Sequence, residues 1–411
     1  MVKRKLDGLD YILRMCSLYI LVWTISPPLQ HPMLFRVLVL GAGLVWLFFS
    51  WLKIAEVKTD IHGIYLAVCV FCVIAIMIEW ACGINLVDAA ISQLQIIILL
   101  LFVLQYIYYS KNDIHFIKLL TIVAIICLSI WQLRTLIEYQ TNPGVSRLLV
   151  KSGEVARYYA AKGIGGYGLI YPSVFSNMAL MFLLGQWKGK KRILLLVPLL
   201  IGIILVFSSG YLIAVIMTLA SLFCWIARMF TQKKNTAIFI SIIAILMIIV
   251  VCLELLLKYS DFVLKSLEGT FYHQKVKEII NALLTDESTG KLEGRTNRYL
   301  MSIQGIFKYP FVGAKILGME KELGGHSTLI DMLGMYGIVS FCFYYAIISA
   351  LRFMYKSTRN KGYVIAFIIL LLLNGCLNTL VGNHGVIFIV IPGVSLLSSG
   401  EGSCKKFERL Q

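Results

Sequence analysis

One histidine, His326, stands directly before an apolar stretch, in the sequence HSTLIDMLGMYG. A neutral imidazole can accept a proton near physiological pH, which suits a general base that deprotonates a hydroxyl group. The spacing is equally compatible with a histidine that only caps a helix at a membrane interface. Asp331 follows five residues later, and a carboxylate inside a membrane-spanning helix is costly unless it faces protein or water. We therefore expect Asp331 to face the protein interior.

Basic side chains gather in the two longest polar segments, residues 138–166 and 258–327. The candidate anion ligands are Arg147, Arg157 and Lys162 in the first segment and Arg295 and Arg298 in the second. Arg295 and Arg298 are three residues apart in the first turn of a predicted amphipathic helix, so they share a face beside unpaired backbone N–H groups. Guanidinium groups make bidentate, charge-assisted contacts with phosphate. The pattern predicts an anionic ligand, with ordinary solvated loops as the alternative.

A glycine-rich run, GIGGYG at 163–168, matches the dinucleotide-binding fingerprint by its letters. No predicted strand precedes it, and it opens an apolar span, so we interpret it as a flexible entry into that span whose backbone could approach a ligand closely. The polar segments hold no Asp-x-Asp pair and no His/Glu cluster suited to magnesium or manganese. No metal and no other cofactor is expected.

Membrane-spanning helices are the elements that must position these residues. The chain has 411 residues, of which 59% are hydrophobic and only 14% charged, which excludes an ordinary soluble domain. Apolar runs near the ~20 residues needed to cross a bilayer recur along the sequence. The twelve predicted spans are 11–25, 34–52, 63–83, 89–109, 116–137, 167–184, 193–208, 211–230, 237–257, 328–353, 363–380 and 386–397. We expect one all-α, polytopic membrane domain over residues 1–411.

The placement of charge predicts the orientation of these spans. Alternate short breaks are basic, such as those at 188–192 and 352–361, whereas the breaks between them, such as 26–32, contain no Lys or Arg. Short cytoplasmic loops carry the excess of positive charge, so both termini are expected in the cytoplasm and segments 138–166 and 258–327 outside it. About half of the net charge of +17 follows from this pattern, and no nucleic-acid partner is indicated.

Three stretches together are similar to the O-antigen polymerase and O-antigen ligase superfamily. The sequence from His326 to Gly337 resembles its motif of His-Asn or His-Ser before an apolar helix, with a glycine eleven positions later. GRTNRYLMSIQGIFKYPFVG, from Gly294 to Gly313, is similar to the segment upstream of that histidine. Arg157, ten residues and then Gly168 looks like the arginine-to-glycine spacing of the polymerase loops. The second loop departs by one residue, which leaves open whether Arg295 or Arg298 is the equivalent.

The resemblance implies a GT-C-like glycosyltransferase of about twelve transmembrane helices in the bacterial cytoplasmic membrane. Its donor and acceptor would be glycans on undecaprenyl pyrophosphate, and its surroundings would include membrane lipids, a flippase and a chain-length regulator. We then expect Arg157, Arg295 and Arg298 to bind the pyrophosphate, Arg147 and Lys162 to support them, and His326 to be the base in a metal-independent, inverting transfer. The arginines of the two outer segments would have to converge near His326.

The resemblance favours a capsule or O-antigen polymerase over a ligase that transfers the glycan to another acceptor. The residues that favour a polymerase are the loop AAKGIGGYGLIY and the serine after His326. The rival from another class is a lipid-linked oligosaccharide flippase or a secondary transporter. Transporters of this size are typically built from repeated halves and broken helices in matching positions, and neither is evident here.

Overall fold

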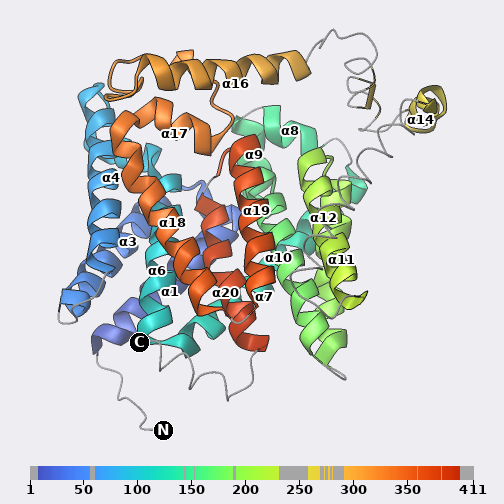
Figure 1. The fold of residues 1–411 in the computed structure, drawn as a ribbon, viewed down its shortest axis with the longest axis horizontal. Helices are drawn as coiled ribbons and strands as arrows, with labels where there is room; N and C mark the ends of the chain where they lie inside the picture. The colour runs from blue at the N-terminus through green and yellow to red at the C-terminus, as the bar shows by residue number, and fades with distance from the viewer. Residues whose placement is uncertain are drawn as a thin grey trace. The chain divides into compact units, whose positions relative to one another are not determined.

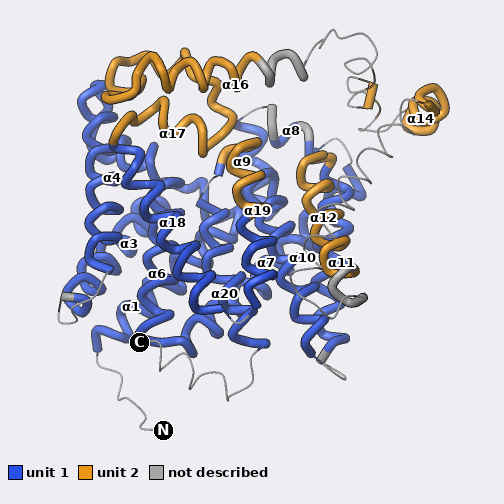
Figure 2. The backbone as a smooth tube through the Cα atoms, in the orientation of Figure 1, with its two compact units in different colours: residues 1–209, 339–368, 380–411 blue, residues 210–338, 369–379 orange. Residues whose placement is uncertain are grey.

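The computed structural model describes most of the chain in helices. The described residues are 8–55, 61–142, 145–151, 153–187, 191–230, 258–268, 291–358, 360–380 and 382–398, with the single positions 273, 276, 277 and 280. Their regular structure consists of α-helices and short 3₁₀-helices, without strands (Figure 1). The chain divides into two compact units, coloured separately in Figure 2. The first is Met1–Ser209, Val339–Ile368 and Leu380–Gln411, and the second is Gly210–Ile338 and Ile369–Thr379.

The first unit is a bundle of long apolar helices. They are α1 (Gly8–Ile25), α3 (Met33–Ala55), α4 (Ile61–Ala81), α6 (Leu94–Asn112), α7 (Ile114–Thr141), α10 (Tyr167–Gln186), α11 (Lys191–Ser208), α18 (Ser340–Ser357) and α20 (Ile387–Ser398). Helices α6 and α10 are apolar on all sides and almost fully buried, so they form the centre of the unit. Helix α3 leaves most of its apolar side chains exposed, as expected for a helix at the lipid boundary.

Short helices join these long ones. They are α2 (Pro27–Gln30), α5 (Leu86–Ser92), α8 (Val145–Lys151), α9 (Gly153–Ala161) and the 3₁₀-helix η3 (Gly382–Val386). Segment 138–166 was expected to be a loop, but it is largely helical. Helix α7 continues to Thr141, and α8 and α9 follow it. The fourth span begins at Leu94 rather than at the predicted residue 89, since Asn85 caps the separate helix α5.

The described helices confirm an integral membrane protein. Seven apolar helical stretches are long enough to cross a bilayer, and four more are apolar but shorter. The protein is therefore an all-helical, multi-pass membrane protein. The predicted ninth span, 237–257, lies outside the described residues. So do most of residues 273–284, HQKVKEIINALL, where apolar side chains at helical spacing predict another amphipathic helix.

The tenth predicted span, residues 328–353, lies within the apolar helical stretch Thr328–Ser357, one of the seven long enough to cross a bilayer, but a turn that was not predicted interrupts the helix. Helix α17 (Thr328–Tyr336) ends at a 3₁₀ turn, η2 (Gly337–Val339), before α18 begins. Gly337 has a φ of 52°, and a Cβ there would lie 2.4 Å from the carbonyl oxygen of Phe311. Gly313, with a φ of 81°, would likewise place a Cβ 2.3 Å from the oxygen of Met335. The helix is interrupted here because the backbone at Gly337 and the backbone at Gly313 approach more closely than any side chain would allow.

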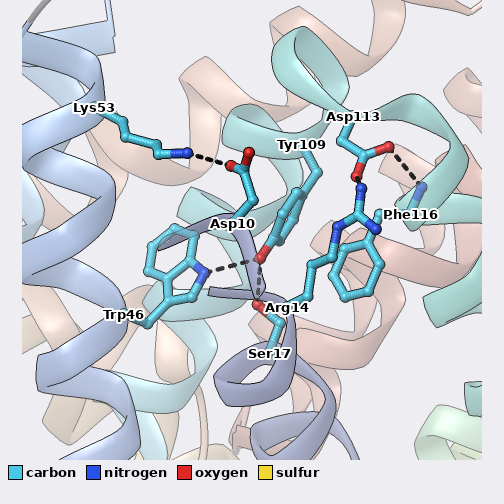
Figure 3. Close-up of polar contacts among 8 residues, drawn as sticks. All are labelled: Asp10, Arg14, Ser17, Trp46, Lys53, Tyr109, Asp113 and Phe116. Atoms are coloured by element: carbon cyan, nitrogen blue, oxygen red, sulfur yellow. Dashed lines mark hydrogen bonds and ion pairs between the residues drawn. The ribbon is translucent and has the colours of Figure 1, made fainter. Parts of the chain in front are cut away.

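Charged residues at one end of α1 are paired with neighbouring helices (Figure 3). Arg14 forms an ion pair with Asp113, which also accepts a hydrogen bond from the amide of Phe116 and caps α7. Lys53 pairs with Asp10. The Tyr109 hydroxyl accepts from Trp46 Nε1 at 3.2 Å. Partly buried charges need such partners, so the pairs connect α1 to α3 and to the start of α7.

The second unit contains α12 (Leu212–Phe230), α14 (Ser260–Ser266), α16 (Lys291–Lys308), η1 (Glu320–Glu322), α17 and the last part of α19 (Lys361–Leu377). An amphipathic helix is present as predicted, but α16 begins at Lys291, so Arg295 and Arg298 do not lie in its first turn beside unpaired N–H groups, and that part of the prediction was wrong. The apolar side chains of α16 are exposed, including Leu300 and Phe307, whereas Ser302 and Gly305 are buried towards α17 and the preceding loop. Small residues on that face allow α16 to lie close to α17.

Candidate functional site

In the second unit, His326 lies in direct contact with Arg298. Arg298 Nη1 of α16 meets Nε2 of the imidazole. A guanidinium has no lone pair to share, so it can only donate, and the imidazole nitrogen must accept. The contact therefore requires the neutral form of His326 with its proton on Nδ1. Arg298 is exposed and His326 is partly exposed, so both groups are open to a ligand.

A buried carboxylate holds the chain beside His326. Asp331 is 3% exposed, which confirms that it faces the protein interior. It accepts a hydrogen bond from the hydroxyl of Ser302 on α16 and another, at 2.7 Å, from the backbone amide of Ser327. Ser302 Oγ also accepts from the amide of Gly324 at 3.0 Å. One carboxylate and one hydroxyl thus connect α16, the loop and α17 around the histidine.

Further hydrogen bonds hold the same loop to the end of α19. Ser327 caps α17 by accepting from the amide of Ile330 at 3.2 Å, and its hydroxyl donates to the carbonyl oxygen of Gly375 at 3.1 Å. The amide of Thr328 donates to the oxygen of Asn378 at 3.2 Å. His326 is a residue of this held loop, and its neighbour Ser327 is the helix cap.

Two glycines before His326 explain how the loop approaches α16. A Cβ on Gly324 would lie 2.1 Å from the carbonyl oxygen of Arg298, so only glycine fits against the helix backbone. Gly325 has a φ of 66°, in the left-handed region that favours glycine. Sequence reasoning singled out Arg298 and His326 but not their contact, and it missed Ser302, because one serine in an amphipathic helix carries no signal of its own.

In the first unit, Arg157 lies on α9, exposed. Helix α9 packs against α8 and α2. The glycine-rich run that follows is a tight turn packed on protein side chains. Gly163 has a φ of 80°, and a Cβ there would meet the Trp131 ring at 2.4 Å. Tyr139 donates its hydroxyl to the oxygen of Gly165 at 3.0 Å. The glycines therefore allow close approach of the chain's own helices, and they position α9.

Lys162 is exposed and lies over the ring of Tyr158, with Nζ 4.2 Å from the ring centroid. Its hydrogen bond to the Tyr158 hydroxyl raises the pKa of the ammonium group, so it stays charged. Arg134 donates from Nε to the carbonyl oxygen of Lys162 at 3.3 Å. The side chains of Arg147, on α8, and Arg295, on α16, lie outside the described part of the structure, so their predicted roles stay predictions.

Two residues near Arg157 were not predicted: His31, just after α2, and Arg36, in the first turn of α3. Burial first, and then the charges of Arg36 and Arg157, lower the pKa of the His31 imidazole. Helix α2, which His31 follows, packs against α9, which carries Arg157, and Arg36 Nε donates to the oxygen of Gln30 at 2.8 Å, so the three basic groups lie near one another. In the sequence, residues 26–32 were noted only as a short break without Lys or Arg. Nothing in the sequence connected His31 in that break with Arg36 in the following span.

Within the described ranges, no three His, Cys, Asp or Glu side chains are grouped so that they could hold a metal ion. The chemistry on hand is that of guanidinium, ammonium and imidazole groups, which bind anions and move protons. Comparison with protein-family models and with curated proteins finds no match.

Proposed function

We propose that this protein is a membrane glycosyltransferase that acts on a glycan linked to a lipid pyrophosphate, and more specifically a polysaccharide polymerase. The observation that carries the proposal is the contact between Arg298 and a neutral His326, held by Ser302 and Asp331. A guanidinium and an imidazole in contact supply, in one place, a ligand for an anionic leaving group and an acceptor for a proton.

The reaction assigned to these residues is a single displacement. The acceptor hydroxyl oxygen forms a bond to the anomeric carbon of the donor, and its proton passes to His326. The bond between that carbon and the pyrophosphate oxygen breaks, and the leaving pyrophosphate keeps the electron pair. Arg298, with Arg157 and Arg295, stabilises the charge that builds on the pyrophosphate, and the anomeric configuration inverts. Arg147 and Lys162 support the bound anion.

The proposal places the donor, the acceptor and the product in the cytoplasmic membrane of a bacterium. The donor and acceptor are then undecaprenyl-pyrophosphate-linked repeat units of an O-antigen or capsule, and the site faces away from the cytoplasm. A flippase would deliver the substrates and a chain-length regulator would limit the product. Positive charge concentrated at the alternate short breaks supports this orientation.

Purified protein in nanodiscs tests the proposal with a synthetic undecaprenyl-pyrophosphate-linked repeat unit. We expect products of two and more units, and release of undecaprenyl pyrophosphate, without added metal and in the presence of EDTA. The His326→Gln variant should lose the product while retaining binding of the donor. Substrate that crosses the bilayer of a liposome chemically unchanged would instead establish a transporter.

Deletion of the gene in its host separates polymerase from ligase. Loss of long glycan with accumulation of single lipid-linked repeat units supports polymerisation. Long chains that accumulate on the lipid would establish a ligase. Complementation with the wild-type gene and with the His326→Gln gene gives the matched comparison, since both encode the same fold with and without the proposed base.

A further inference from the structure

We propose that His31, Arg36 and Arg157 form a binding site in the first unit for the phosphoryl groups of a membrane lipid. The inference rests on the proposed function for the identity of that lipid, the undecaprenyl-pyrophosphate donor. His31 and Arg36 were not among the residues assigned to the anion. All three belong to one compact unit, so the site is complete within it.

The segment between α1 and α3 is held in one conformation. Ser26 is the N-cap residue of α2, which begins with Pro27 and Pro28, and its hydroxyl accepts from Trp131 Nε1 at 3.1 Å. Gln30 Nε2 donates to the oxygen of Thr24 at 2.5 Å. Helix α2 then packs against α9, which carries Arg157. His31 directly follows α2, so this packing places its ring near Arg157.

Arg36 is tied to the same segment and has donors left over. Its Nε donates to the carbonyl oxygen of Gln30 at 2.8 Å, which fixes the planar group and leaves four N–H bonds on the two terminal nitrogens. The ion pairs among described side chains are Arg14–Asp113, Lys53–Asp10 and Lys308–Glu322. None of these includes Arg36 or Arg157, and Glu154, the carboxylate of α9, is in ion-pair contact with neither.

The ring of His31, near the two cations, is suited to act as a neutral donor. Its Nδ1 is buried without a hydrogen-bond partner among the described atoms. An unpaired lone pair costs less in such a place than an unpaired N–H, so the proton belongs on Nε2. The lowered pKa of His31 agrees with a neutral ring. Nε2–H can then donate to an anion that also meets the two guanidinium groups.

The surroundings indicate a lipid as the source of the anion. Around Arg36, the outward side chains of α3 are apolar, and Met33, Leu34 and Val37 are between 44% and 66% exposed. Such side chains at the boundary of a bundle face acyl chains, and a cation among them lies near the level of the headgroups. Two guanidiniums and one N–H donor match the several oxygens of a diphosphate better than those of a monoester.

The test is binding, measured on the full-length protein in nanodiscs of phosphatidylcholine, with undecaprenyl pyrophosphate as the probe. Removing one hydrogen-bond donor to the charged diphosphate should weaken binding about tenfold to a hundredfold, so Arg36→Gln, Arg157→Gln and His31→Ala should each raise Kd. Arg352→Gln removes an exposed arginine from α18 and serves as the control with the same change of charge. Unchanged Kd in Arg36→Gln and Arg157→Gln overturns the site.

Competition identifies the source of the phosphoryl group. We expect unlabelled undecaprenyl pyrophosphate to displace the probe, and excess phosphatidylglycerol or inorganic pyrophosphate to do so at least a hundredfold more weakly. Equal displacement by phosphatidylglycerol overturns the assignment to the donor lipid. Should Arg36→Gln not fold, as judged by gel filtration, Arg157→Gln on the exposed helix α9 decides. The binding assay requires no turnover, so it tests the site separately from the proposed function. If the wild-type protein shows no transferase activity but the variants still lose binding, the proposed function is refuted and the binding site is retained.

Discussion

Replacing Asp331 by asparagine should disable His326 without touching it. The carboxylate of Asp331 is buried and accepts from Ser302 Oγ and from the Ser327 amide. The asparagine oxygen can accept from the Ser327 amide, and its NH₂ group can donate to Ser302 Oγ, whose proton then goes to the carbonyl oxygen of Arg298 at 3.0 Å. Both contacts lose the charged acceptor. Hydrogen bonds to a charged group contribute about 1.5–3 kcal/mol each, so we expect a loss of about 2–3 kcal/mol from the held loop.

The effect on catalysis should appear mainly in kcat. A loop held less firmly presents the imidazole at the acceptor hydroxyl less often, and 1.4 kcal/mol corresponds to a factor of ten in a rate or equilibrium constant, which gives a fall of about tenfold to a hundredfold. The KM for the donor should change little, because Arg157, Arg295 and Arg298 are retained. Initial rates with the lipid-linked repeat unit, at several donor concentrations, separate the two constants.

Two further variants frame this measurement. Asp88→Asn makes the same chemical change on α5, where Asp88 is exposed and accepts from Asn85 Nδ2 at 2.6 Å, and it should leave kcat unaltered with only a small loss of thermal stability. Ser302→Ala removes only the hydroxyl and should lower kcat less than Asp331→Asn does. Wild-type kcat in Asp331→Asn, together with an unchanged unfolding temperature, would refute the role assigned to the carboxylate.

Three other predictions concern packing, the base and pH. A Cβ at Gly393 of α20 would lie 1.7 Å from Thr121 Oγ1 of α7, so Gly393→Val should lower the unfolding temperature in detergent by several degrees, whereas Gly41→Val, with open space around it, should not. His326→Ala should lower kcat by at least about a hundredfold, with added imidazole restoring part of it. The lowered pKa of His31 means that the unfolded chain binds the proton more readily, so stability contributed by the neutral ring is lost as pH falls through about 6.5. His31→Gln should flatten the fall in unfolding temperature between about pH 7 and pH 5.5, measured by scanning fluorimetry.

The sequence predicted the membrane helices well wherever length and apolarity decide the structure. Helices α1, α3, α4, α7 and α10 begin within a few residues of the predicted spans. Hydropathy could not reveal the break at Gly337, because the residues on both sides of it are apolar and the cause is a backbone contact with a segment more than twenty positions earlier. It also could not show that 138–166 is helical, since the short helices there carry mixed side chains.

For the candidate site, residue type and position predicted more than spacing did. A histidine before an apolar run and arginines in polar segments stand out in an apolar chain, and the structure brings Arg298 and His326 together. Ser302, His31 and Arg36 did not stand out. Each acquires its meaning from a partner on another element, Asp331, Arg157 and Gln30 respectively, and such pairings depend on how helices pack.

The contact between Arg298 and His326 connects the two halves of the proposed reaction. As long as Arg298 donates to Nε2, that nitrogen cannot take a proton, and an imidazolium would face a like charge. A bound diphosphate changes both conditions, because it draws the guanidinium to its own oxygens and supplies the negative charge that makes an imidazolium tolerable. Under the proposed function, the base is therefore released only when the leaving group is in place. The order that the proposed function implies is donor first: the acceptor hydroxyl is deprotonated only after the donor has bound. No deprotonated hydroxyl then forms in a site without a donor.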